Sequence, residues 1–389
     1  MAIDWAARRR DAGPYLRAVS IYLCSRLVIL LAIDIASIYL PLWKSDVWQS
    51  GTRWYDHLLR WDSEWYAGIA GHGYHYSGVP TGDLQPVVFY PLYPLLSGFA
   101  AKVFGISPAV ALLLVANAAA VLAVVLLFRI ARRHCGDDVA LLAVALLSFY
   151  PGSLFLSAGY SEALALLLIL CCFTLLDSRR FFAASGAAGL ALATRFAAVA
   201  LLPVLLWELW LQFRMDRKRF VLHALACMAI ASAGLWLYML YLEMAFGHPF
   251  AFADAQSAFN GDTSLAGRLI AALTLQPFLR LRFTDFSPAG LDQWFFILLL
   301  VLTMSAWRRL PASLPLFSLG ALLVPYLTLS GGPGGFTSMT RFGVLAFPAF
   351  IVLAEYCRRS LWLGIAAIGL FAALLALYAA LFGQWYWVG

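Results

Sequence analysis

The sequence predicts an all-α, polytopic integral membrane protein with about eleven transmembrane helices, each near the ~20 residues that span a bilayer. Of its 389 residues, 63% are hydrophobic and only 12% are charged. A soluble domain is usually about half apolar and about a quarter charged. Apolar runs recur from one end of the chain to the other. We therefore expect one integral membrane domain over residues 1–389.

The basic residues predict the sidedness of this domain. The net charge is +7, and most arginines lie in short segments between apolar runs, where they set topology and do not indicate nucleic-acid binding. The six cysteines show no CxxC or Cys/His metal spacing, so neither a disulfide framework nor a metal site is predicted. The basic clusters expected in the cytoplasm lie at 8–17, 129–133, 179–180, 214–219, 308–309 and 358–359.

The N-terminal part is expected to hold one helix and then a large outer loop. The first apolar run, at 17–40, is too long for a cleaved signal segment and predicts a retained helix. Residues 41–105 are expected to form a large extracytoplasmic loop, and the candidate catalytic residues described below begin there. Its last part, 87–105, is apolar but broken by Pro91 and Pro94, so we expect a partly interfacial or re-entrant segment.

The remaining chain predicts a helical core over 106–246, a second outer loop over 247–290 and C-terminal helices over 291–389, ending outside. Residues 181–212 begin and end inside, so this run should be a hairpin of two short helices that turns near Thr194–Arg195. SGGPGG at 330–335 is expected to be the most flexible stretch. The other helices are expected near 108–130, 138–157, 160–177, 220–246, 291–307, 312–329, 342–357 and 361–381.

The first outer loop contains the most polar run of the chain, RWDSEWYAGIAGHGY at 60–74. Asp62 and Glu64 point the same way only if this segment is extended or irregular. They could then supply a general base with a positioning partner, or oxygen ligands for a divalent cation. Asp62 could equally be the N-cap of a helix over SEWYAGIA. Spacing alone leaves these alternatives open.

Aromatic side chains surround the two acids. Trp61, Trp65 and Tyr74 suit the lipid–water interface and could also stack on sugar faces. His72 could bind a metal or tune a carboxylate, although solvated histidines at this position would need no such role. The second outer loop holds FGHPFAFADAQSAFNGD, which on its own indicates only an amphipathic loop helix.

Three further charged residues stand near the outer ends of predicted helices. Glu162, in GYSEALALL, could simply complement the dipole of its helix. Arg195 interrupts an apolar run, where a charge is costly and usually paired. Arg341 lies at the start of a helix, where positive charge opposes the dipole. A guanidinium at either place suits a phosphate, and a loop carboxylate would also explain Arg341.

Five segments together resemble the PIG-V group, that is GPI mannosyltransferase II and its bacterial relatives, which have the GT-C membrane glycosyltransferase architecture. They occur in family order, fall on one predicted face and cover roughly residues 55–355. They are RWDSEWYAGIAGHGY with VVFYPLYPLL, then YSEALALLL, LALATRFAAV, GHPFAFADAQSAF and TRFGVLAFPAFIVLAEY.

The resemblance implies an inverting transfer of a sugar, mannose, from a polyprenyl- or dolichyl-phosphate donor to an acceptor hydroxyl. It gives Asp62 the role of general base, and Glu162 that of orienting the acceptor. Arg195 and Arg341 match basic positions that hold the lipid phosphate. Glu64 is a further catalytic candidate. The substrate-binding candidates are Trp61, Trp65, His72, Tyr74, His248 and Gln256.

The chain is short and loop-poor, without a lysine-rich retention tail, which indicates a bacterial inner-membrane protein with its site facing the periplasm. A bacterium makes no GPI anchor, so the acceptor, a lipid or a glycan, and the sugar stay open. No cofactor is expected, and a divalent metal is possible but not required. The alternative function is that of a transporter or lipid flippase. The broken helical hairpin around Arg195 favours this alternative, whereas the lack of a sequence repeat argues against it. A protein O-mannosyltransferase or a lipid A-type aminosugar transferase would share the architecture. Apart from membrane lipids, no other partner is implied.

Overall fold

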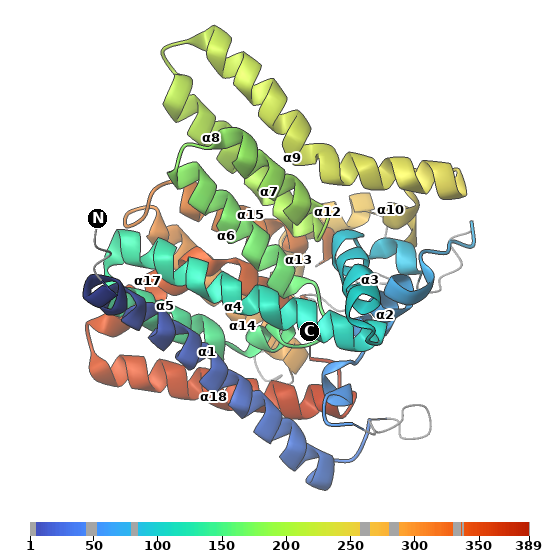
Figure 1. Ribbon diagram of the computed structural model, residues 1–389, viewed down its shortest axis with the longest axis vertical. Coiled ribbons are helices and arrows are strands. Elements are labelled where there is room, and N and C mark those ends of the chain that lie inside the picture. Colours follow the sequence, from blue (N-terminus) through green and yellow to red (C-terminus); the bar gives the residue numbers. More distant parts are fainter. Residues whose placement is uncertain are drawn as a thin grey trace.

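The computed structural model describes residues 5–43, 53–78, 85–256, 265–279, 288–329, 336 and 338–388. All regular structure in these ranges is helical, which confirms the predicted all-α class (Figure 1). The glycine-rich stretch at 330–335 lies outside the described residues. The helices of the N-terminal half are α1 Trp5–Tyr39, η1 Asp56–Leu58, α2 Asp62–His72, η2 Pro86–Val88, α3 Leu92–Phe104, α4 Pro108–Cys135, α5 Asp137–Phe149, η3 Pro151–Leu156, α6 Glu162–Asp177 and α7 Phe181–Leu192.

The C-terminal half continues the bundle, with shorter helices on the outer connections. Its elements are η4 Phe196–Ala200, α8 Leu201–Phe213, α9 Arg217–Phe246, α10 Ala251–Ala255, α12 Leu265–Leu273, α13 Gln276–Leu279, α14 Pro288–Ala306, α15 Ser313–Leu329, α16 Met339–Phe342, η5 Gly343–Leu345, α17 Phe347–Arg358 and α18 Leu361–Gly383.

Several helices are long and apolar enough to cross a membrane. In the described ranges, five pass by length and composition: Gly13–Tyr39, Pro108–Cys135, Phe196–Phe213, Arg217–Phe246 and Leu361–Gly383. Together with shorter apolar helices, they establish an integral membrane protein. The expected number of about eleven spans stays a prediction.

The helix expected near 342–357 is broken, and in this respect the prediction is wrong. Met339–Leu345 and Phe347–Arg358 meet at an angle of 84°. Pro348 lies in the first turn of α17 and has no backbone N–H to continue the preceding helical ladder, so the helix restarts there. The break places the segment that contains Arg341 in its own short turn.

The hairpin expected over 181–212 is confirmed. Two short helices, α7 and α8, meet at a break around Arg195. The rings of Phe181, at the start of α7, and Phe213, at the end of α8, lie 6.1 Å apart, so the two ends return to the same place. Helix α9 packs along α7 through Gly234, where an added Cβ would lie 2.1 Å from the carbonyl oxygen of Gly189.

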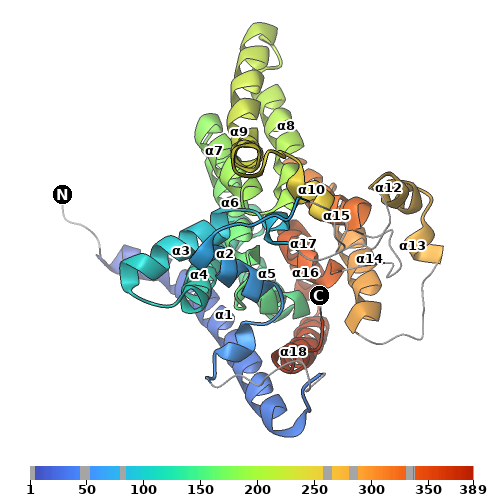
Figure 2. The same cartoon turned by 90° about the vertical axis from the view of Figure 1, so that its right-hand side faces the viewer.

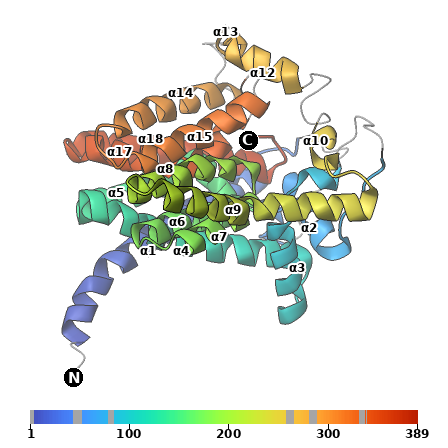
Figure 3. The same ribbon diagram turned by 90° about the horizontal axis from the view of Figure 1, so that it is seen from above.

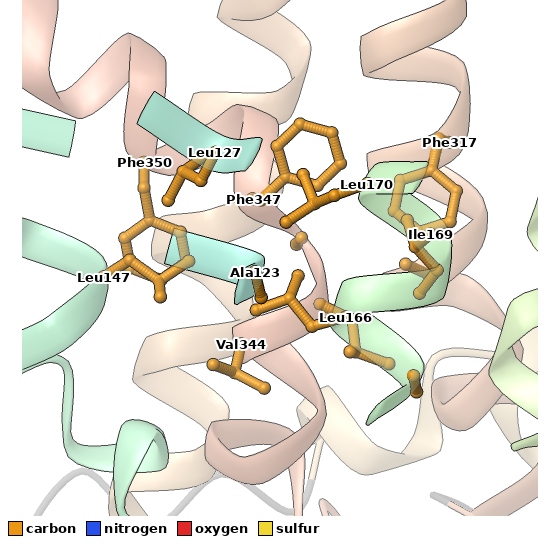
Figure 4. Packing of buried hydrophobic residues seen from close by; sticks show 14 of the residues in the cluster. Ala123, Leu127, Leu147, Leu166, Ile169, Leu170, Phe317, Val344, Phe347 and Phe350 are labelled. Carbon is orange, nitrogen blue, oxygen red and sulfur yellow. The ribbon is translucent and has the colours of Figure 1, made fainter. Parts of the chain in front are cut away.

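The core lies where α4, α5, α6 and α17 pack together. Alanines along one side of α4, such as Ala123, are fully buried and let the neighbouring helices approach closely. Leu166 of α6 and Phe347 of α17 fill the space beside them (Figure 4). This rigid centre holds the ends of the helices in fixed relative positions.

The basic turns meet at one end of the bundle. Arg133, at the end of α4, pairs with Asp177, at the end of α6. Glu355, near the end of α17, accepts from Cys135 and pairs with Arg309, which follows α14. The helix starts at α2, α3 and α6 therefore lie at the other end, where α10 is also found (Figures 1 and 2). This polarity agrees with the predicted topology.

Helix α3 runs crosswise to α4 in both Figure 1 and Figure 3. It has only 13 residues, and its first backbone N–H, at Leu92, donates to the carbonyl of Ala193 at 2.9 Å. A short apolar helix across the end of a bundle favours the interfacial interpretation of 87–105.

Candidate active site

Four charged side chains form a continuous chain of ion pairs at the end of the bundle opposite the basic turns. Arg341 Nη1 lies 2.7 Å from Asp62 Oδ2, and Arg341 Nε donates to Glu162 Oε1. Arg195 Nη1 donates to that same oxygen. The order is Asp62, Arg341, Glu162, Arg195, and the formal charges sum to zero. The structure thus brings together the four residues that the resemblance selected.

Each residue of this ion-pair chain lies at or next to the end of an element. Asp62 is the first residue of α2, and Glu162 is the first residue of α6. Arg195 lies at the break between α7 and η4, and Arg341 lies in α16. Helix ends converge here because the core fixes where each helix stops.

The ion-pair chain is open only at its two ends. The side chain of Glu162 is fully buried and that of Arg341 is 6% exposed, whereas Asp62 and Arg195 are 13% and 11% exposed. Glu162 Oε2 is buried and has no hydrogen-bond partner among the described residues. Asp62 and Arg195, at the two ends, are therefore the members that keep some exposure to solvent. Glu162 contacts both arginines and so holds the two guanidinium groups next to each other.

Aromatic rings line the guanidinium groups. Arg341 lies 4.5 Å from the ring centre of Tyr160 and 5.2 Å from that of Phe155, and Arg195 lies 4.8 Å from that of Phe342. Such rings attract a cation through their faces and keep water away from it. They also strengthen the ion pairs by lowering the local dielectric.

Tyr160 also fixes the start of α2. Its hydroxyl accepts the backbone N–H of Asp62 at 3.3 Å and donates to the carbonyl of Arg60 at 3.2 Å. Trp61 has a left-handed φ of 55°, which turns the chain sharply just before Asp62. The Trp61 ring packs against Trp387 with centroids 5.3 Å apart, so this ring is engaged with the C-terminal segment.

The carboxylates of Asp62 and Glu64, in the polar run at 60–74, point in different directions. Both lie on helix α2, where residues two apart face different ways, and Glu64 is exposed. The N-cap of α2 is Trp61, and the Asp62 carboxylate pairs with Arg341 instead. The N-cap alternative for Asp62 is therefore wrong. Within the described ranges, no group of three or more His, Cys, Asp or Glu side chains could hold a metal.

Two hydroxyls that were not predicted from the sequence join this site. The Tyr66 hydroxyl lies 2.9 Å from Ser161 Oγ, which also accepts from Arg195 Nη1 at 3.3 Å. Burial raises the pKa of Tyr66 to about 12, with the nearby Arg195 opposing the shift, so Tyr66 keeps its proton at neutral pH. Its place four residues after Asp62, on the same helix face, was the available signal.

The other predicted substrate contacts lie in the outer segments. Trp65 stacks on Phe89, and the Tyr74 hydroxyl donates to the Phe89 carbonyl at 2.8 Å. His248 Nε2 lies 2.6 Å from Asp254 Oδ2, in the connection after α9. The structure places these residues outside the ion-pair chain. His72 is exposed at the end of α2, and Gln256 follows the last residue of α10.

Gly152 allows the turn that contains Arg341 to approach η3. A Cβ added there would lie 2.1 Å from the carbonyl oxygen of Thr340. We expect Gly152→Ala to lower stability by about 1–3 kcal/mol, as overpacking does, and to displace Arg341. Thermal unfolding in detergent checks this. Gly186→Ala is the control, because nothing lies within 4 Å of a Cβ there. Equal melting temperatures for the two variants would contradict the expectation.

Comparisons with known proteins agree with this fold. The profile of the family described as Mannosyltransferase (PIG-V) matches residues 39–236. No curated protein matches the chain. The Archaeoglobus fulgidus oligosaccharyltransferase, in its apo form, is similar with a TM-score of 0.51 and 14% identity over 95% of this chain and 56% of that one. The chain thus spans little more than half the length of that enzyme.

ArnT from Cupriavidus metallidurans, solved bound to undecaprenyl phosphate, has a TM-score of 0.50 and 14% identity. The match covers 94% of this chain and 75% of that one. At such identity the likeness shows the fold alone. The predicted GT-C-like architecture is therefore confirmed.

Proposed function

The chain belongs to the PIG-V mannosyltransferase family, and from this premise we propose that it moves a mannosyl group from a polyprenyl-phosphate donor to an acceptor hydroxyl. The ion-pair chain of Asp62, Arg341, Glu162 and Arg195 supports the proposal most directly. It joins an accessible carboxylate to two guanidinium groups, which are the base and the phosphate-binding groups that this transfer needs.

The proposed step balances in atoms and charge. The acceptor oxygen attacks C1 of the sugar and loses its proton to Asp62 Oδ2. The bond between C1 and the phosphate oxygen breaks, so the sugar is transferred with inversion and polyprenyl phosphate leaves. Negative charge thereby moves from the Asp62 carboxylate to the phosphate. The leaving phosphate needs no proton.

Arg341 is suited to stabilise this negative charge first on Asp62 and then on the phosphate. In the free protein it neutralises Asp62 at 2.7 Å. When Asp62 takes a proton, this guanidinium loses its partner there and can bind the phosphate oxygens instead. Glu162 keeps Arg341 and Arg195 in place throughout, so the positive charge is preorganised where negative charge develops.

A lipid-linked donor fits the surroundings of Arg195. The start of α3 is hydrogen-bonded beside this arginine, at the carbonyl of Ala193. Leu95, Phe99 and Phe104 of α3 are exposed, as expected for residues in contact with lipid or a prenyl chain. The undecaprenyl phosphate bound to ArnT supports this class of donor.

We place the site at the extracytoplasmic face of a bacterial inner membrane. The support is the separation of the ion-pair chain from the basic turns at the other end of the bundle, since basic turns favour the cytoplasm. The two arginines supply positive charge at the phosphate, and we propose that the transfer proceeds without a cofactor. The acceptor, a lipid or a glycan, is left for the product to reveal.

Reconstitution into liposomes tests this function. We expect the protein to move radiolabel from polyprenyl-phosphate mannose to a lipid in an extract of the host membrane, with and without a chelator. Dependence on divalent metal would contradict the metal-free step. Movement of labelled donor between leaflets without a new product would favour the transporter or flippase alternative. If a product forms only when the donor carries another sugar, the assignment of mannose as the transferred sugar is wrong.

A further inference from the structure

A buried carboxylate lies behind the turn that contains Arg341. Asp292, in α14, is only 3% exposed, and its Oδ1 accepts the backbone N–H of Thr340 at 2.7 Å. The backbone N–H groups of Ser338 and Met339 also lie near enough to this carboxylate to stabilise its charge. A charge at such a position in a membrane protein is costly and usually has a specific role.

The turn needs an acceptor from outside itself. The first N–H groups of a helix have no partner within it, and α16 has only four residues, Met339–Phe342. Its N-cap, Ser338, has a left-handed φ of 56° and makes no side-chain capping bond. Such a backbone persists only where the surroundings fix it. Asp292 provides that fixation from another helix, as a cap in trans.

The residue just before Arg341 is held on both sides of its Cα. The N–H of Thr340 donates to Asp292, and the carbonyl oxygen of Thr340 packs against Gly152. The direction of the next side chain depends on the backbone of this residue. That side chain must reach Asp62 and Glu162 together, and a displacement of about 1 Å in such an arrangement can cost about 10²-fold in rate.

We propose that Asp292 is a positioning residue that orients Arg341 toward the lipid phosphate. This inference rests on the proposed function. Asp292 does not touch the substrate, because it lies under the turn and accepts backbone N–H groups. A carboxylate suits the place because both of its oxygens accept, whereas an amide offers one accepting oxygen and an NH₂ group that would face the N–H groups of the turn.

A double-mutant cycle on lipid-phosphate binding tests the proposal. The probe is undecaprenyl phosphate, and the protein is the full chain in nanodiscs. We expect Asp292→Asn to weaken binding about tenfold in the wild-type background, a coupling usual for residues in one network. In an Arg341→Ala background the same change should have no further effect. Thr303→Ala is the control, because Thr303 also lies in α14 and its buried hydroxyl is hydrogen-bonded to Ser318 of α15. This variant should leave the affinity unchanged.

The outcomes separate the two proposals. An equal loss of affinity from Asp292→Asn in both backgrounds would show that Asp292 acts elsewhere, and would overturn the inference. Failure of the wild type to bind the probe would overturn the proposed function and the inference with it. If Asp292→Asn does not fold, Asp292→Ser, which leaves room for a water to accept the N–H groups, replaces it in the cycle.

Discussion

Asp62→Asn should abolish sugar transfer while it strengthens binding of the lipid phosphate. An amide cannot take the proton of the acceptor hydroxyl, and loss of a general base costs about 10²–10⁴-fold in rate. The amide oxygen can still accept from Arg341 Nη1, so the site stays assembled. The Arg341 guanidinium is no longer neutralised by a carboxylate at position 62. A phosphate therefore no longer competes with that carboxylate for Arg341. We expect an affinity gain of about tenfold for undecaprenyl phosphate.

Glu64→Gln is the matched control for Asp62→Asn. It removes the same charge from the same helix, but Glu64 is exposed, and the structure pairs Arg341 with Asp62 and Glu162 instead. We expect wild-type transfer and wild-type affinity from it. Radiolabel transfer and lipid-phosphate titration on the two variants check the expectation. Equal effects of the two substitutions would show a general surface charge effect. Undiminished transfer by Asp62→Asn would remove Asp62 as the base.

Part of this site could be predicted from sequence because its residues lie in short motifs. Glu162 follows Ser161 at the mouth of a helix, and Arg195 interrupts an apolar run that begins and ends with basic residues. Length and charge alone therefore predicted the hairpin. What sequence could not show is that Arg341 contacts two acids, 279 and 179 positions away in the chain. Such contacts depend on how the whole bundle packs.

The fold shows the same division. Apolar length predicted most helices within a few residues, because a helix in lipid must satisfy its backbone internally. The break before Pro348 was missed, since a proline near a helix start is compatible with both a continuous bent helix and a restart. The sequence did not predict a role for Asp292, because a single acidic residue at the start of an apolar run is common. Its partners are backbone N–H groups, which no sequence pattern marks.

Arg341→Met should be the most destabilising change in the site. It leaves the buried Glu162 with Arg195 alone and leaves Asp62 without its partner. Removing one partner from a buried ion pair costs about 3–5 kcal/mol. Arg309→Gln is the control at the other end, where both partners, Arg309 and Glu355, are about a quarter exposed. We expect at most about 1 kcal/mol from it. Thermal unfolding in detergent, together with radiolabel transfer, measures both.

The charge balance of the ion-pair chain gives this prediction a second part. The formal charges of the four groups sum to zero. Arg341→Met leaves one negative charge in excess. Adding Glu162→Gln restores a net charge of zero, because only Asp62 and Arg195 are then charged. We therefore expect the double variant to regain stability relative to Arg341→Met and to stay inactive, because the group that follows the charge onto the phosphate is gone. Recovery of transfer with stability would mean that Arg341 serves the fold alone. If neither recovers, the contacts of Glu162 with both arginines matter more than the net charge of the site.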